Sequence, residues 1–225
     1  MESSGERAKL ILPARFTAVT AVIAAVAIIM AFLVTSPASP VAAGEVSLRD
    51  SSVRADWSSL QSQRGVAILY RHAVAPGGGD PAGFDVRDCS TQRNLSRAGL
   101  RQASRMGREL RERAIRIAAV YTSPWCRARD TATAMRVGPV RELRRLGSVF
   151  QASQSTALRR ERATTRLLAR HAERQGVAIL VFHQANIIDL TGIAPASGEG
   201  VVVTFDKATN SIEVLGSIPA PTVIN

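Results

Sequence analysis

The chain has 225 residues, of which 46% are hydrophobic and 21% charged, a composition that favours a globular protein over a disordered one. The formal net charge is +11, and arginine supplies nearly all of the positive charge because Lys9 and Lys207 are the only lysines. Aromatic residues make up only 4%, so the basic residues lack the interleaved aromatics typical of single-stranded nucleic-acid binding. We therefore expect no nucleic-acid partner.

The amino-terminal region predicts export. Residues 16–34 are apolar apart from two threonines, which is about the length of a membrane-spanning helix, and basic residues precede them. Small residues at Val41 and Ala43 would suit signal-peptide cleavage before Gly44. Residues 1–44 are thus a signal peptide or a membrane anchor with an N-terminal hydrophobic helix. Either form places the domain outside the cytoplasm, in the periplasm or anchored to the inner membrane. If the segment is not cleaved, it is the part of the chain that contacts the membrane.

Residues 45–64 indicate a polar linker with a short helix over 57–63, and a single domain is predicted over 65–225. The domain begins with an apolar run, 65–70. Such a run is typical of a strand that is buried on both faces of a parallel sheet.

Arg71 and His72 follow the first strand directly. In open α/β sheets, ligands bind at the carboxyl ends of the strands, so a permanent cation and a titratable imidazole here predict an anion site. Residues 74–81 are rich in Pro and Gly and form a loop over this site. The glycines at 77–79 could cradle a phosphate through backbone N–H groups or act as a flexible lid.

Strand and helix patterns then alternate along the chain. We predict helices over 97–114, 126–135, 156–174 and 186–191, and strands over 115–121, 137–143, 177–182, 201–205 and 212–215. The last two strands form a hairpin. The predicted fold class is α/β: a three-layer α/β/α sandwich with a mostly parallel central sheet.

Two further residues of the same kind follow strands. Arg127 lies in the first turn of the helix after the second strand, and His183 follows the strand over 177–182. Neighbouring parallel strands would bring these residues to one edge together with Arg71 and His72. Arginine forks that hold phosphoryl oxygens, with an imidazole that attacks phosphorus, would carry out phosphoryl transfer through a histidine.

Residues 69–73 (LYRHA), 122–128 (TSPWCRA) and 181–184 (VFHQ) resemble three motifs of the histidine phosphatase superfamily, in its phosphoglycerate-mutase-like branch. The resemblance covers roughly residues 65–205. The resemblance implies a histidine-phosphatase-like domain that needs no cofactor, in which His72 is the nucleophile that becomes phosphorylated. It also implies that Arg71, Arg127 and His183 are catalytic and bind the phosphoryl group, with Gln184 beside them in the substrate site. The export segment further resembles small exported members such as lipopolysaccharide core heptose phosphate phosphatase.

One departure from the family concerns the proton donor. Many members carry a Glu after the middle strand, whereas residues 144–150 contain no carboxylate. Asp80, Asp88 or Glu199 could supply the proton instead, or the leaving group could need little protonation. A missing acid favours a simple phosphatase over a mutase.

Cys89 and Cys126 are the only cysteines, and an even count in an exported domain permits one disulfide. Such a bond would tether the loop after His72 beside the site. The alternative is two unconnected buried thiols. The cysteines and histidines leave no four-ligand pattern for zinc, so we expect no metal. His171 lies on a polar helix, and we interpret it as a structural, hydrogen-bonded residue.

The sequence therefore predicts an exported, metal-independent phosphatase that hydrolyses a phosphomonoester of a small molecule or glycan. One alternative is a non-catalytic periplasmic module that binds phosphorylated glycans or lipids at the same site. A third possibility is an interaction protein whose basic surface binds an anionic membrane. The sequence leaves the natural substrate and the oligomeric state open.

Overall fold

A computed structural model describes residues 53–222 of the chain. The helices are α2 (Trp57–Ser62), α3 (Arg97–Glu112), α4 (Cys126–Met135), α5 (Gln154–His171) and α6 (Gln184–Thr191), with short 3₁₀ helices at Cys89–Thr91 and Arg144–Leu146. The strands are β1 (Ala67–Arg71), β2 (Ile117–Thr122), β3 (Val140–Glu142), β4 (Val177–Phe182), β5 (Gly200–Asp206) and β6 (Ser211–Ile218).

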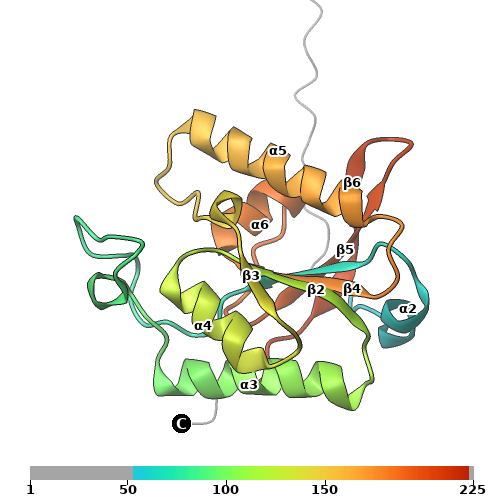
Figure 1. The fold of residues 1–225 in the computed structure, drawn as a ribbon, viewed down its shortest axis with the longest axis horizontal. Coiled ribbons are helices and arrows are strands. Elements are labelled where there is room, and N and C mark those ends of the chain that lie inside the picture. Colours follow the sequence, from blue (N-terminus) through green and yellow to red (C-terminus); the bar gives the residue numbers. More distant parts are fainter. Residues whose placement is uncertain (1–52, 223–225) are drawn as a thin grey trace, which may run out of the picture. The chain divides into compact units, whose positions relative to one another are not determined.

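The six strands form one mixed, mostly parallel sheet in the order β3-β2-β4-β1-β5-β6 (Figure 1). β4 is parallel to both of its neighbours, β2 and β1, and β3 is parallel to β2. β5 runs antiparallel to β1 and to β6, and forms the predicted terminal hairpin with β6. β1 and β4, whose apolar runs predicted buried strands, are therefore adjacent at the centre of the sheet.

Helices cover both faces of the sheet, as predicted (Figure 1). On one face, α3 and α4 pack through Met106, Leu110 and Met135 against alternate residues of the central strands. On the other face, α5 and α6 pack through Leu168 and Ile187. Burial of these apolar side chains is the main stabilising contribution to the fold, and it fixes the strand ends that carry the site.

The bounds predicted for α4 and β4 are confirmed, and the other elements differ from the prediction by a few residues. α3 begins after Ser96, whose hydroxyl accepts a hydrogen bond from the N–H of Gly99, and it ends at Glu112 rather than at Ala114. Ala114 has a φ of 52°, a left-handed conformation that a helix cannot contain. α5 begins two residues earlier than predicted because Ser153 is its N-cap.

The predicted signal or anchor segment, residues 1–44, lies outside the described residues. Within residues 53–222, no helix is long and apolar enough to cross a membrane. The described part of the predicted linker packs onto the domain: α2 places Leu60, which is 1% exposed, in the core together with Ala55.

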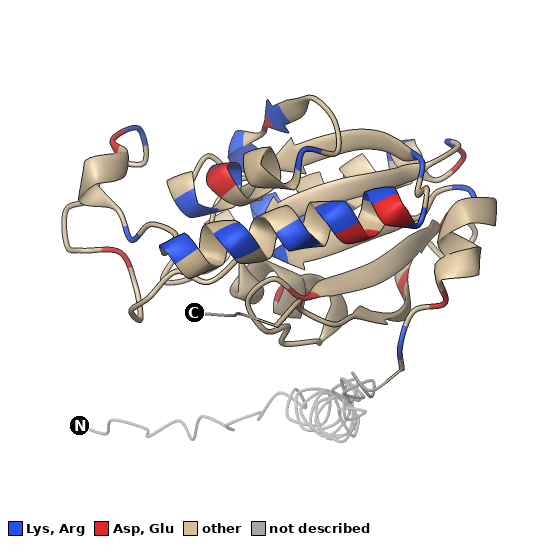
Figure 2. Ribbon diagram, turned by 90° about the horizontal axis from the view of Figure 1, so that it is seen from below, with Lys and Arg blue, Asp and Glu red and all other residues tan. Residues whose placement is uncertain are grey.

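Basic side chains lie along the exposed side of α3, where Figure 2 shows a row of blue bands. Arg97, Arg101 and Arg108 are exposed there, and Arg108 forms an ion pair with Glu112 one turn later. Part of the arginine excess therefore occupies a solvated helix face.

Candidate active site

The carboxyl ends of β1 and β4 deliver two histidines to the same place. The strands are paired in parallel with Arg71 opposite Phe182, and the N–H of His72 donates a hydrogen bond to the carbonyl of Phe182 at 3.0 Å. The next residue of β4 is His183, so the two imidazoles lie side by side, with ring centroids 5.6 Å apart. Both line a cavity of about 380 Å³, within the usual size of a small-molecule site.

The ring of His72 is held in one tautomer. Its Nδ1 lies 2.8 Å from the carbonyl oxygen of Ala73, which can only accept a hydrogen bond, so Nδ1 carries the proton and Nε2 carries the lone pair. The side chain is 3% exposed. The pKa of His72 is lowered to about 3, mainly by burial; the bond to Ala73 opposes this shift, and the nearby arginine charges, Arg127 foremost, add to it. His72 is therefore neutral, as a nucleophile must be.

His183 is held by the end of β2. Its Nε2 lies 2.8 Å from the hydroxyl oxygen of Ser123, which accepts a hydrogen bond from the N–H of Trp125 at 3.3 Å. Burial lowers the pKa of His183 well below its ordinary value, and the neighbouring His72 and Arg127 add to the effect. This second imidazole is thus neutral too.

Arg127 comes from the first turn of α4 and meets His72, as the sequence predicted. Its Nε donates a hydrogen bond to His72 Nε2 at 3.2 Å. Its Nη1 forms an ion pair with Asp80 at 2.7 Å, and the side chains of this pair are only 5% and 10% exposed. The carboxylate therefore orients the guanidinium group beside Nε2 of His72.

Two guanidinium groups line the cavity itself, those of Arg71 and Arg93, whereas Arg127 lies behind His72 and is not part of the lining. Arg71 Nη1 donates to the carbonyl of Pro195, and Arg93 Nη1 donates to the carbonyl of Gly77. In both side chains the Nε–H is buried without a hydrogen-bond partner. A buried donor in this state has a strong preference for an acceptor, and a phosphoryl oxygen is one.

Sequence reasoning did not single out Arg93. It lies 21 residues after His72 along the chain, at the end of the loop, and only folding brings it to the cavity. The only local feature of the sequence near Arg93 is the helix start that follows it, where Ser96 is the N-cap of α3. The predicted Gln184 does line the cavity, where its side-chain amide donates to the carbonyl of Pro195 at 3.0 Å.

None of the three carboxylates predicted as proton donors lines this cavity. Asp80 is bound by Arg127, by the N–H of Arg93 and by the indole N–H of Trp125. Burial on its own would raise the pKa of Asp80, but these donors outweigh it and hold the pKa below its ordinary value. Asp80 is therefore ionised and serves to position Arg127.

The other two carboxylates are used locally. Asp88 caps the 3₁₀ helix at Cys89–Thr91 by accepting a hydrogen bond from the N–H of Ser90. Glu199 accepts a hydrogen bond from the N–H of Ala196 at 2.7 Å. Their positions explain why neither faces the reacting atoms.

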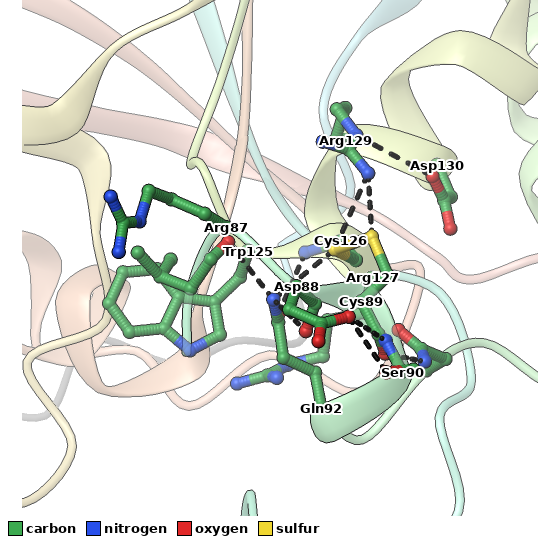
Figure 3. The surroundings of a disulfide bond; sticks show 12 residues. Arg87, Asp88, Cys89, Ser90, Gln92, Trp125, Cys126, Arg127, Arg129 and Asp130 are labelled. Carbon is green, nitrogen blue, oxygen red and sulfur yellow. Dashed lines mark hydrogen bonds and ion pairs between the residues drawn. A yellow bond between two sulfur atoms is a disulfide. The ribbon is translucent and has the colours of Figure 1, made fainter. Parts of the chain in front are cut away.

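The predicted disulfide joins Cys89 to Cys126, with 5.7 Å between the Cα atoms (Figure 3). Gln92 strengthens the same attachment, because its side-chain oxygen accepts a hydrogen bond from the N–H of Cys126 at 3.0 Å. The bond ties the loop that carries Asp80 and Arg93 to the start of α4. Among the described residues, no group of three or more His, Cys, Asp and Glu side chains could hold a metal ion.

Residues 68–148 match the sequence profile of the Histidine phosphatase superfamily (branch 1). A search of curated proteins found no match. Among solved structures, the protein histidine phosphatase SixA complexed with tungstate is 16% identical, with 69% of this chain and 97% of that chain covered and a TM-score of 0.51. A mutant phosphoserine phosphatase from Entamoeba histolytica in complex with phosphoserine is 14% identical, with coverage of 68% and 95% and a TM-score of 0.51.

The product of an open reading frame from Mycobacterium tuberculosis is 17% identical, with coverage of 71% and 98% and a TM-score of 0.50. At such identities the likeness to solved structures shows the fold alone, whereas the profile match rests on the residues themselves. The matched segment includes Arg71, His72 and Arg127. The profile match over residues 68–148 therefore relates this part of the chain to the histidine phosphatase superfamily, branch 1, and indicates a phosphatase.

Proposed function

We propose that this protein is an exported, metal-independent phosphatase that hydrolyses phosphomonoesters through a phosphohistidine on His72. The observation that carries the proposal is the state of His72: a neutral imidazole with its proton fixed on Nδ1 and its Nε2 lone pair beside the guanidinium group of Arg127. The unpartnered Nε–H groups of Arg71 and Arg93 add two donors for the phosphoryl oxygens.

In the first step, Nε2 of His72 attacks phosphorus, the P–N bond forms, and the P–O bond to the leaving group breaks. Arg71, Arg93 and Arg127 compensate the charge on the equatorial oxygens, with His183 as a further donor. In the second step, water attacks phosphorus, the P–N bond breaks, and inorganic phosphate leaves. The attacking water gives up its proton to solvent, and the leaving group takes one from solvent. His72 returns to its neutral state.

The test uses the full-length chain and phenyl phosphate. We expect wild-type turnover that EDTA does not reduce, and an acid-labile, alkali-stable phosphoryl group on the protein after rapid quenching. His72→Asn should abolish both turnover and labelling, a loss of about 10⁴-fold or more. Full activity of that variant, or turnover that vanishes with EDTA and returns with a metal ion, would contradict the proposal.

Export is supported by the apolar run over residues 16–34 and by the Cys89–Cys126 disulfide, a bond that persists in oxidising compartments. Fractionation of cells that produce the full chain would test it. We expect the protein in the periplasm or the inner membrane with its cysteines oxidised. A cytoplasmic protein with two free thiols would refute this part of the proposal.

The second candidate is a non-catalytic module that binds phosphorylated glycans or lipids, and the lack of an Asp or Glu side chain lining the cavity favours it. It predicts phosphate binding without turnover of any phosphoester and without a trapped phosphohistidine. The sequence resemblance to lipopolysaccharide core heptose phosphate phosphatase makes a phosphorylated heptose one substrate to include in the same assay.

A further inference from the structure

The cavity that holds His72 has an unusual outer wall. Among the described residues, the exposed large hydrophobic side chains are Val53, Leu100, Phe150, Leu158 and Ile188. Two of these, Phe150 at 57% exposure and Ile188 at 40%, line this cavity. Large apolar side chains left in water beside a pocket commonly mark a surface that an apolar ligand covers.

The position of Phe150 is fixed by the fold. The side chain of Asn186, which is 4% exposed, donates to the carbonyl of Gly147 at 2.9 Å and accepts from the N–H of Val149 at 3.2 Å. These bonds fasten the turn that carries Phe150 to α6, the helix that carries Ile188. The side chains of Phe150 and Ile188 are therefore held next to the same cavity by the fold, and we call this pair the apolar wall.

The apolar wall faces the glycine loop. A Cβ placed on Gly79 would lie 4.0 Å from Cε1 of Phe150, and the three glycines at 77–79 all line the cavity. The glycine loop therefore lies close to the ring of Phe150, and both line the same cavity.

The rest of the lining offers little to a polar leaving group. Its uncharged polar side chains are those of Ser148 and Gln184 among the described residues, and each already makes one bond to the protein: the hydroxyl of Ser148 accepts from the N–H of Phe150, and the amide of Gln184 donates to Pro195. The hydroxyl proton of Ser148 and the side-chain oxygen of Gln184 are the groups left to a polar leaving group. Within residues 53–222, no Asp or Glu side chain lines the cavity to pair with a substrate amine. A sugar or an amino alcohol would leave hydroxyl or ammonium groups poorly paired there.

We infer that the substrate class is a small aryl phosphomonoester whose uncharged ring packs against the apolar wall, with Phe150 and Ile188 as specificity-determining residues. The inference rests on the proposed function for its chemical step. In that step the P–O bond breaks to release a phenolate, which takes its proton from water.

The lack of a proton donor in the cavity fits such a leaving group. A phenol has a pKa of about 10, whereas an alkyl alcohol has a value of about 16, close to that of water. Without a general acid, a phenolate therefore departs much faster than an alkoxide. The apolar wall and the missing acid thus favour the same substrate class by independent physical reasons.

A binding experiment tests the wall without requiring turnover. Calorimetry on the full chain compares phenylphosphonate with methylphosphonate, two non-hydrolysable ligands with the same head group. We expect phenylphosphonate to bind about tenfold more tightly to the wild type, and Phe150→Ala and Ile188→Ala to remove most of that advantage. Leu158→Ala, which removes an exposed leucine of α5 outside the cavity, is the matched control and should keep it.

Kinetics then test the substrate class. A phenolate leaves easily from any phosphate ester, so a preference for phenyl phosphate over glycerol 2-phosphate is expected but does not test the wall. The diagnostic result is a KM for phenyl phosphate raised about tenfold in Phe150→Ala, with kcat/KM for glycerol 2-phosphate unchanged. Equal losses for both substrates, or equal affinity for the two phosphonates, would overturn the inference. Phosphonate discrimination without turnover of any ester would instead refute the proposed function and leave the wall standing.

Discussion

All three described histidines are buried, yet their surroundings differ. His171, at the end of α5, lies 3.1 Å from the carbonyl of Gly176, only five residues away along the chain. His72 meets Arg127, 55 residues away, and His183 meets Ser123, 60 residues away. The first histidine is a structural, hydrogen-bonded residue, as predicted, and its partner is local. The other two are held by contacts that only the whole fold provides, and a cavity opens in front of them. Burial by itself therefore does not identify a functional histidine, whereas the convergence of distant charged groups does.

Replacing one histidine at a time gives the strongest test of the difference between His183 and His171. His183→Asn should lower kcat/KM for phenyl phosphate by about 100-fold to 1,000-fold, because the variant loses a group that contacts the phosphoryl site. His171→Asn should keep kcat/KM within about twofold of the wild type. Losses of equal size in the two variants would erase the distinction between them.

A second test removes the covalent tie beside the site. The Cys89–Cys126 bond closes a loop with a sequence separation of 37 residues, so its loss should lower the free energy of unfolding by about 3 kcal/mol. Urea denaturation of the Cys89→Ser/Cys126→Ser double variant measures this difference. We expect turnover to fall as well, because the loop carries Asp80 and Arg93. An unchanged unfolding midpoint would show that the disulfide contributes nothing to stability.

The role of Asp80 gives a smaller effect. Asp80→Asn should lower kcat/KM about tenfold to 100-fold, because Arg127 loses the carboxylate that orients it. If Asp80 only positions Arg127, the loss is the same for phenyl phosphate and cyclohexyl phosphate. A much larger loss for cyclohexyl phosphate would identify Asp80 as the proton donor instead. Asp85→Asn, which breaks an exposed ion pair with Arg87, is the matched control.

The buried histidines also predict how stability depends on pH. Below about pH 6.5 the unfolded chain binds a proton at each histidine, while burial keeps His72 neutral in the folded state down to about pH 3. Because the unfolded state takes up more protons, lowering the pH must destabilise the fold, by up to about 1.4 kcal/mol per pH unit for each such histidine.

Denaturation in phosphate-free buffer between pH 6.5 and pH 4.5 measures this slope. The pH range lies above the ordinary pKa of an aspartate, so Asp80 contributes little to it. His72→Asn should reduce the change in the free energy of unfolding per pH unit by the contribution of one histidine. An unchanged slope in this variant would mean that His72 is protonated in the folded protein.

The sequence predicted those parts of the molecule that local signals encode. The bounds of α4 and β4 followed from hydrophobic pattern, and the sites of His72 and His183 followed from two similar apolar strands. Arg93 and the role of Asp80 could not be predicted in this way. The Asp80–Arg127 ion pair joins residues 47 positions apart, so a carboxylate that looked available as an acid is occupied by a guanidinium group.

The pairing of β1 with β4 limits how the chain can change in length. Each imidazole follows its strand with no intervening residue, and successive side chains of a strand point to opposite faces. One residue inserted in either strand would turn its histidine away from its partner, whereas the segment over 74–93 has no such restriction at most of its positions. Libraries that seek new substrates should therefore vary the length of that segment and keep both central strands intact.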